Sequence, residues 1–228
     1  YTGNLMKNSK GLFTNAIFGF CNMITKLREE EYDYIFVAFD AGKHTFRHQA
    51  YKDYKGGRKA MPDEFRVQIP YIKKYLDLLN IKHVEMDDYE ADDLIASVSE
   101  LALNRGLDEI KVVSGDKDLL QLVRDNVHVT LTKKGISELD DYTKDNFYEK
   151  MGFYPNQVPD YKGLVGDSSD NLPGIKGIGE KTALKLLSDY QTLENIIENA
   201  DSIKGKTKEL ILGGKEIGLQ CKFFATLK

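Results

Sequence analysis

The sequence has little cysteine and no long apolar run. Its two cysteines, Cys21 and Cys221, lie far apart, each in an apolar and helix-like context. We therefore expect buried thiols rather than a disulfide or a pair of metal ligands. Free thiols are typical of a reducing cytoplasm. No apolar stretch is long enough to span a membrane and no secretory signal opens the sequence, so no membrane partner is expected.

The charge balance does not by itself favour nucleic acid. The 228 residues carry a net charge of −4, whereas nucleic-acid-binding domains are usually basic. However, eight acidic residues fall into four short groups, and the rest of the chain then carries +4. A mildly basic body around an acidic pocket that metal ions neutralise is compatible with DNA binding.

Strand and helix patterns alternate over the first 143 residues. The pattern predicts an α/β fold with a mostly parallel central sheet flanked by helices. The apolar run 34–39 is typical of a strand buried on both faces. Beyond it we expect strands at 81–85, 109–114 and 127–132, and helices at 14–30, 64–79, 89–104 and 117–123. After residue 143 the strand signals end, so we divide the chain into an α/β core (1–150) and a helical subdomain (151–228).

Four groups of acidic residues follow strands or begin helices. In an open parallel sheet, ligands bind beyond the carboxyl ends of the strands, so these groups are expected to converge there. Divalent cations would relieve the resulting repulsion. Oxygen ligands without nearby His or Cys favour Mg²⁺ or Mn²⁺ over zinc. The groups are Asp40; Glu90, Asp92 and Asp93; Asp116 and Asp118; and Asp167 and Asp170.

Each group also has a purely structural explanation. The acids at 90–93 complement a helix dipole, Asp116 caps the next helix, and Asp40 opens a turn. One shared metal site explains all four groups together. Helical spacing puts Glu90 and Asp93 on one face, with Asp92 roughly opposite. Of these three, Asp93 is therefore the residue expected to cap the helix or to support the ligands.

The segment 166–183 joins two of the acids to a glycine-rich turn. Gly174, Gly177 and Gly179 precede a helix that begins near Glu180. Such glycines let backbone N–H groups approach a phosphate, and a helix N-terminus favours an anion. The alternative is an acidic loop followed by an ordinary turn. Carboxylates beside a phosphate-binding turn predict chemistry on a phosphodiester backbone.

These motifs together resemble the bacterial 5′-nuclease family, which includes the 5′→3′ exonuclease domain of DNA polymerase I and stand-alone relatives similar to flap endonucleases. The resemblance implies a PIN-like core with a helical arch at about 41–62. It also implies a helix-hairpin-helix (helix-three-turn-helix) at about 157–190. The matching stretches, in the family's order, are 36–65, 89–96, 114–123, 132–138 and 166–183.

The resemblance implies a two-metal enzyme that cuts branched or 5′-ended DNA, such as a flap, nick or overhang, during replication or repair. Two cations would activate water and stabilise the leaving 3′ oxygen. No organic cofactor and a monomer are expected. By the family pattern, one metal would be held by Asp40, Glu90, Asp92 and Asp93, and the second by Asp116, Asp118, Asp167 and Asp170.

The basic segment 43–59 resembles the family's arch or gateway. By this resemblance Lys55 and Arg58 are catalytic and contact the scissile phosphate, where their charge offsets that of the transition state. Arg47 is a further phosphate contact, and Tyr54 stacks on a displaced base. A solvated basic loop with a Gly-Gly turn is the alternative.

The glycine-rich turn resembles the hairpin with which the family grips duplex DNA without reading its sequence. The resemblance implies that Gly174, Gly177 and Gly179 present backbone amides to a phosphate. Lys176 and Lys181 would add charge. The family's hairpin often holds a potassium ion through carbonyl groups, so K⁺ is a further expected ligand.

The sequence departs from the family at its start. The family begins with a strand that carries a metal-binding aspartate, whereas the first acidic residue here is Glu29. We expect that strand to exist outside the sequence, because a central strand is hard to delete. Without it, the alternative is a catalytically impaired protein that binds DNA structures. An RNA-cleaving nuclease is a third, weaker possibility. No polymerase motif occurs, and whether a polymerase follows is left open.

Overall fold

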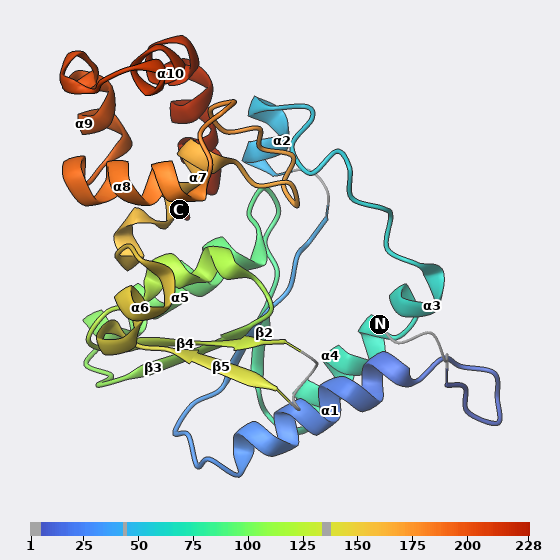
Figure 1. Cartoon of the computed structure of the whole chain (residues 1–228). Coiled ribbons are helices and arrows are strands. Elements are labelled where there is room, and N and C mark those ends of the chain that lie inside the picture. Colours follow the sequence, from blue (N-terminus) through green and yellow to red (C-terminus); the bar gives the residue numbers. More distant parts are fainter. Residues whose placement is uncertain (1–5, 43–44, 134–137) are drawn as a thin grey trace.

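The computed structural model describes residues 6–42, 45–133 and 138–228. Within these residues the strands form two sheets (Figure 1). Strand β1 (Phe36–Ala38) pairs parallel with β2 (Lys82–Val84). Strand β3 (Ile110–Ser114) pairs parallel with β4 (Val127–Thr132), and β4 pairs antiparallel with β5 (Leu139–Tyr142). The predicted α/β fold with parallel strand pairs is confirmed, and the antiparallel β5 was not predicted.

The β1–β2 pair is only partly covered. Helices α1 (Asn15–Arg28) and α4 (Ile69–Leu78) pack near it through Ile24 and Leu76, together with Ile81 from the turn before β2. The side chains of β1 are half-buried, so the prediction of a strand buried on both faces was wrong. In the described part of the chain, β1 pairs only with β2, which leaves its other edge without a strand to bury it.

The region predicted as one helix at 64–79 contains two. Helix α3 (Asp63–Arg66) ends before α4 begins at Ile69. Pro70 lies in the first turn of α4, where its missing N–H costs no helical hydrogen bond and its fixed φ suits a helix start. The gateway segment contains the short helix α2 (Phe46–Ala50), followed by turns.

Helix α5 (Ala91–Asn104) packs against both β1 and β3 and so connects the two sheets. The 3₁₀ helix η1 (Lys117–Leu122) follows β3 and packs against α5. The carboxyl end of β1, the start of α5 and the end of β3 therefore lie close together. Three of the four predicted acidic groups are at these points.

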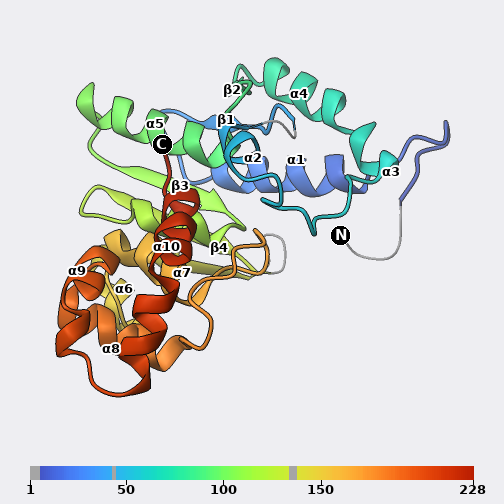
Figure 2. The same cartoon turned by 90° about the horizontal axis from the view of Figure 1, so that it is seen from above.

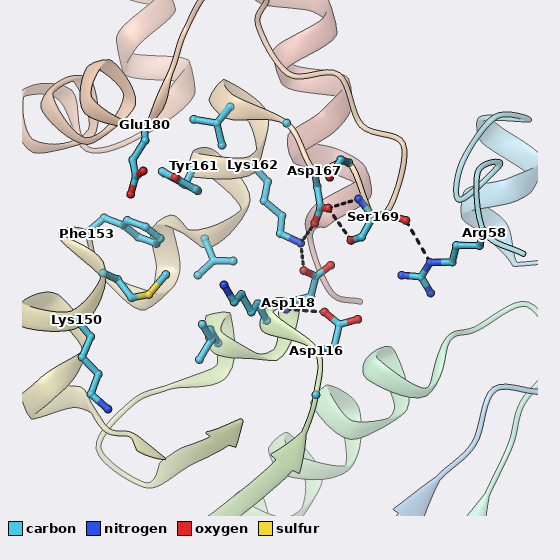
Figure 3. Close-up of a pocket in the computed structure, with 18 residues that line it drawn as sticks. Arg58, Asp116, Asp118, Lys150, Phe153, Tyr161, Lys162, Asp167, Ser169 and Glu180 are labelled. Atoms are coloured by element: carbon cyan, nitrogen blue, oxygen red, sulfur yellow. Dashed lines mark hydrogen bonds and ion pairs between the residues drawn. The ribbon is translucent and has the colours of Figure 1, made fainter. Parts of the chain in front are cut away.

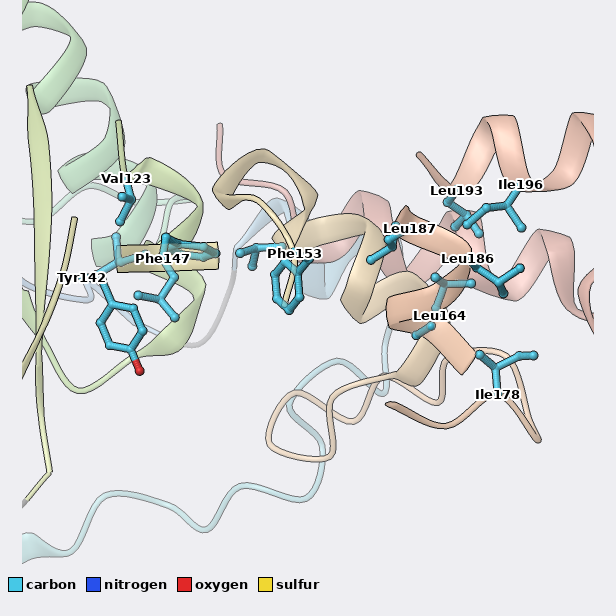
Figure 4. Close-up of a cluster of buried hydrophobic side chains, with 14 of the residues drawn as sticks. Val123, Tyr142, Phe147, Phe153, Leu164, Ile178, Leu186, Leu187, Leu193 and Ile196 are labelled. Carbon is cyan, nitrogen blue, oxygen red and sulfur yellow. The ribbon is translucent and has the colours of Figure 1, made fainter. Parts of the chain in front are cut away.

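The chain after residue 143 is helical, as predicted. With β3 and β4 these helices form the largest core, which includes Phe147, Phe153, Leu164, Leu187 and Leu193 (Figure 4). Short 3₁₀ turns η2 (Pro155–Gln157) and η3 (Ala200–Ser202) join them. The helices are α6 (Lys144–Met151), α7 (Val158–Val165), α8 (Glu180–Tyr190), α9 (Leu193–Glu198) and α10 (Lys206–Ala225).

Helices α7 and α10 touch through glycines. A Cβ on Gly163 would lie 2.9 Å from the carbonyl oxygen of Gly218, so any larger residue would force the helices apart. After α10 the chain returns to α5, and Figure 2 shows the C-terminus beside that helix. None of the helices in the described residues is long and apolar enough to cross a membrane.

Candidate active site

Acidic side chains from two segments meet beside a cavity of about 820 Å³ (Figure 3). Asp118 from η1 and Asp167 and Asp170 from the loop after α7 offer carboxylate oxygens within 4.8 Å of one another. Asp116 stands at the start of η1, where it accepts a hydrogen bond of 3.0 Å from the Asp118 N–H. Its predicted capping role is thus confirmed, and its carboxylate stays at the edge of the same cavity.

The loop that carries Asp167 and Asp170 is fixed by its own backbone. Asp167 and Leu172 exchange two N–H···O=C bonds of 2.8 Å. Gly174 has φ +62°, and a Cβ there would lie 2.2 Å from the Gly166 nitrogen. Only glycine fits so close a backbone approach at positive φ. The glycine-rich turn therefore shapes the acidic loop before it.

A buried lysine lies among these acids. The Lys162 ammonium from α7 donates to Asp118 and, at 2.5 Å, to Asp167. Burial by itself would raise the pKa of Asp167, but the bonds from Lys162 and Ser169 lower it to about 2. Sequence reasoning missed Lys162, because a lysine in a helical pattern is normally solvent-exposed and nothing in the run 158–165 marks it as buried.

Among the described residues only Asp118, Asp167 and Asp170 form a group with metal-ligand spacing, so the structure does not gather the acids predicted for the first metal as tightly. Asp40, at the end of β1, accepts a 2.8 Å bond from the Ala91 N–H at the start of α5. Burial, together with the charges of Asp116, Asp40 and Glu90, raises the pKa of Asp92 to about 7. The carboxylates at the end of β1, the start of α5 and the end of β3 therefore act on one another through their charges.

The two gateway cations, Lys55 and Arg58, pair with acids of the site. Lys55 donates to Glu90 at 2.8 Å, and Arg58 donates to Asp170 at 2.7 Å. Their segment is also joined to the acidic loop by backbone groups, since the Lys55 N–H donates to the Asp170 carbonyl at 3.0 Å. The Asn171 side chain donates to the Asp53 carbonyl at 2.8 Å. Both cations thus lie at the acidic centre and compensate part of its charge.

Three predicted site residues have other partners in the structure. Arg47 is 1% exposed and Tyr54 2% exposed, so neither predicted DNA contact is compatible with this arrangement. The Tyr54 hydroxyl lies 3.1 Å from Asp170, and burial with the nearby Glu90 and Asp170 charges raises its pKa. The Asp93 carboxylate accepts two hydrogen bonds from the Arg47 guanidinium and takes part in the capping box of α5, which confirms its predicted capping role. With both oxygens occupied, Asp93 does not fit its predicted role as a metal ligand.

The glycine-rich turn leads directly into α8, whose N-cap is Gly179. Gly174 is buried, whereas Gly177, Gly179, Lys176 and Lys181 are exposed. The predicted phosphate contacts of this turn stay predictions, and the exposed positions leave it open to a large partner.

The donor set fits a hard divalent cation. Every converging ligand atom is a carboxylate oxygen, and Lys162 places a positive charge between two of them. Lys55 and Arg58 likewise compensate Glu90 and Asp170. An acidic cluster that gathers cations in this way suits a divalent cation in both charge and ligand type.

Two family models together match the whole chain. A model of the "5′-3′ exonuclease, N-terminal resolvase-like domain" matches residues 1–152, and one of the "5′-3′ exonuclease, C-terminal SAM fold" matches residues 153–228. The chain therefore belongs to the 5′-3′ exonuclease family. It is 47% identical over 226 residues to DNA polymerase I of Bacillus caldotenax, covering 98% of this chain and 26% of the relative. It is 49% identical over 223 residues to that of Streptococcus pneumoniae (strain ATCC BAA-255 / R6), covering 97% and 25%.

The chain thus spans about a quarter of the length of the curated relatives it matches. Among solved structures, T5 5′-exonuclease with bound zinc superposes with a TM-score of 0.76 at 22% identity, covering 90% of this chain and 79% of that one. The catalytic core of Rad2 in complex with DNA substrate gives 0.59 at 15% identity, covering 93% and 67%. At these identities the likeness establishes the fold.

Proposed function

We propose that the chain is a structure-specific, metal-dependent 5′ nuclease that hydrolyses DNA phosphodiesters at branched or 5′-ended substrates. The observation that carries this proposal is the convergence of acids from the end of β1, the start of α5, η1 and the loop after α7. Asp118, Asp167 and Asp170 lie within 4.8 Å of one another, with Arg58 directly on Asp170. Relatives that are polymerases and neighbours bound to DNA or metal support this choice.

Two Mg²⁺ or Mn²⁺ ions would supply an activated water and charge stabilisation for the leaving oxygen. The chain's own groups divide the remaining work. Asp40, Glu90 and Asp92 would hold one ion, and Asp116, Asp118, Asp167 and Asp170 the second. Lys55 and Arg58 would leave their carboxylates for the scissile phosphate, where a fixed positive charge stabilises the transition state.

The helical part would hold the duplex. Backbone amides at the exposed Gly177 and Gly179 would meet a phosphate at the start of α8, whereas the buried Gly174 would only shape the turn. The exposed Lys176 and Lys181 would add attraction that depends on salt. We extend the proposal to a K⁺ ion bound by carbonyls of this turn, and to the division of the chain into a cleaving part (1–150) and a duplex-holding part (151–228).

The protein is further proposed to act as a monomer in the bacterial cytoplasm, near the nucleoid. The bacterial source of the related polymerases supports that location.

The direct test is incubation with a 5′-labelled flap duplex in Mg²⁺, in Mn²⁺ and in EDTA. Release of the flap only with metal is the expected result. Absence of cleavage at every metal concentration, with binding retained, would instead favour the second candidate, a DNA-structure binder.

The second candidate draws on the cations of the site, since Lys162, Lys55 and Arg58 already pair with four of its carboxylates. The Asp167→Ala/Asp170→Ala double variant separates the two. A nuclease loses cleavage and keeps flap binding, whereas a binder has no cleavage to lose. Undiminished cleavage by the double variant would remove both residues from the proposed metal site.

A further inference from the structure

We infer that Arg47 and Asp93 are positioning residues that hold the acidic centre in shape, together with the backbone of residues 224–228. We name residues 224–228 the C-terminal strap. The inference rests on the proposed function, because it assigns a supporting role at the proposed metal site. It joins three segments that are distant in sequence: α2, the start of α5 and the strap.

Nearly every hydrogen-bond donor of Arg47 is used inside the protein. Its Nε donates to the Phe224 carbonyl at 2.8 Å, and one terminal nitrogen donates to the Thr226 carbonyl at 2.9 Å. Both terminal nitrogens also form a fork with the Asp93 carboxylate, at 2.6 and 2.8 Å. A guanidinium has five N–H groups, and these bonds use four. The nearest acid left for the fifth is Glu90, at 3.7 Å.

Asp93 in turn holds the backbone that presents the metal-site acids. One oxygen accepts from the Glu90 N–H at 3.2 Å, and the other accepts from the Lys228 N–H at 3.0 Å. The Glu90 side chain completes a capping box with the Asp93 N–H. The first turn of α5, which carries Glu90 and Asp92, is therefore fixed by a residue whose own oxygens are occupied.

The strap also holds the second group of acids. The Gln121 amide donates to the Ala225 carbonyl at 2.9 Å, and its oxygen accepts from the Leu227 N–H at 3.1 Å. The same amide donates to the Asp118 carbonyl at 2.9 Å. The strap residues Phe224 and Ala225 are buried. One strap thus connects α5, which carries Glu90, to η1, which carries Asp118, and sets the spacing between the two acid groups.

Because Glu90 lies next to Arg47, loss of Asp93 is expected to weaken metal binding as well as stability. Without the Asp93 charge, the Arg47 guanidinium would be buried and unpaired, a costly state. The nearest replacement is Glu90, at 3.7 Å. Glu90 would then turn toward Arg47 and away from the metal. Loss of a group that orients a ligand typically weakens metal binding about 10- to 100-fold.

The test compares Asp93→Asn with Asp160→Asn in the full chain. Asp160 is a matched control, since it is 3% exposed and accepts from the Leu193 N–H and from Lys222, each at 2.7 Å. Mn²⁺ affinity and stoichiometry are measured by electron paramagnetic resonance, and melting temperature in EDTA. Both variants should melt at lower temperature. Only Asp93→Asn should weaken Mn²⁺ binding, about 10-fold at unchanged stoichiometry, and lower kcat with little change in the KM for flap DNA.

Two results would overturn the inference. Loss of one Mn²⁺ per chain in Asp93→Asn would make Asp93 a ligand, and unchanged Mn²⁺ affinity would make the pair merely structural. If Asp93→Asn does not fold, Gln121→Ala decides in its place: several-fold weaker Mn²⁺ binding supports the strap, and unchanged binding refutes it. Failure of the proposed function is recognised separately, because the parent protein would then release no flap whatever its Mn²⁺ affinity.

Discussion

The gateway segment contains two arginines that the fold treats in opposite ways. The Arg47 side chain is 1% exposed and is held by Asp93, whereas the Arg58 side chain is 47% exposed and pairs with Asp170. The base of the gateway (45–51) is thus part of the scaffold. We call residues 53–58 the limb of the gateway. Its Lys55 and Arg58 side chains pair with acids of the site, and these acids can exchange them for a metal ion while the cations turn to a phosphate. A basic run can therefore combine a buried scaffold arginine with an arginine whose side chain stays partly exposed.

The largest expected difference between Arg47 and Arg58 is in what each contributes to the free energy of unfolding. Arg47→Ala leaves Asp93 as a buried, uncompensated charge, and should lower the free energy of unfolding by about 3–5 kcal/mol. Arg58→Ala removes a half-exposed cation from Asp170, which keeps its bond from the Tyr54 hydroxyl, and should cost only about 1 kcal/mol. Urea denaturation in EDTA measures both. Equal losses would contradict the division of the gateway into a fixed base and a free limb.

The second effect is on cleavage and concerns the limb alone. Lys55→Ala and Arg58→Ala should each lower kcat by about 10²- to 10³-fold, because each removes a charge aimed at the reacting phosphate. Single-turnover cleavage of a labelled flap at saturating metal measures this loss. Lys52→Ala, at an exposed lysine next to the limb, serves as the control. A comparable loss in that control would point to general attraction of DNA instead.

A third effect is the pH dependence of the metal-free protein. The pKa of Asp92 is raised to about 7, so the folded state holds a proton that the unfolded state releases near pH 4. Stability in EDTA should therefore fall as pH rises from about 4 to 7, by a few kcal/mol at most. Thermal unfolding across this range tests the sign. Asp92→Asn should flatten the profile, and a slope that persists in this variant would assign it to another group.

The smallest expected effect concerns the contact between the limb and the acidic loop. Asn171→Ala removes the bond to the Asp53 carbonyl and should cost about 1 kcal/mol. Because the limb is then held less firmly, trypsin should cut faster after Lys55 and Arg58. Gln49→Ala, which removes an exposed bond to Asp88 at the base, should leave those rates unchanged. Identical digestion of both variants and the parent would show that this contact does not hold the limb.

The acids of the candidate site could be identified from the sequence, because residue type and position relative to the strands both indicate metal ligands. Asp40 and Asp116 follow strand patterns, and the carboxyl ends of parallel strands meet whatever the details of packing. The same reasoning could not place Arg47 or Tyr54, because residue type indicates charge or aromaticity but not burial. Burial is decided by Phe224 and the strap, which lie far along the chain and carry no local signal near either residue.

The remaining differences in the fold have similarly specific causes. Strand β5 has the polar sequence Leu-Asp-Asp-Tyr and is specified by its pairing with β4 rather than by its own pattern. The break between α3 and α4 coincides with Pro70, a residue that propensity averaged over a window does not weigh enough. Lys162 was missed because only the three-dimensional neighbourhood of Asp118 and Asp167 stabilises a charged lysine there.

The strap also imposes an order of events on synthesis. Proteins are made from the N-terminus, and parts of a chain can fold before the rest has emerged. The partners of Arg47 at Phe224 and Thr226 lie 177 and 179 residues further on. A nascent chain that already contains every acid of the centre still lacks the residues that lock the start of α5 against the gateway. The acidic centre is therefore completed only once residues 224–228 have been made, and a shorter nascent chain carries its carboxylates without the frame that holds them in register.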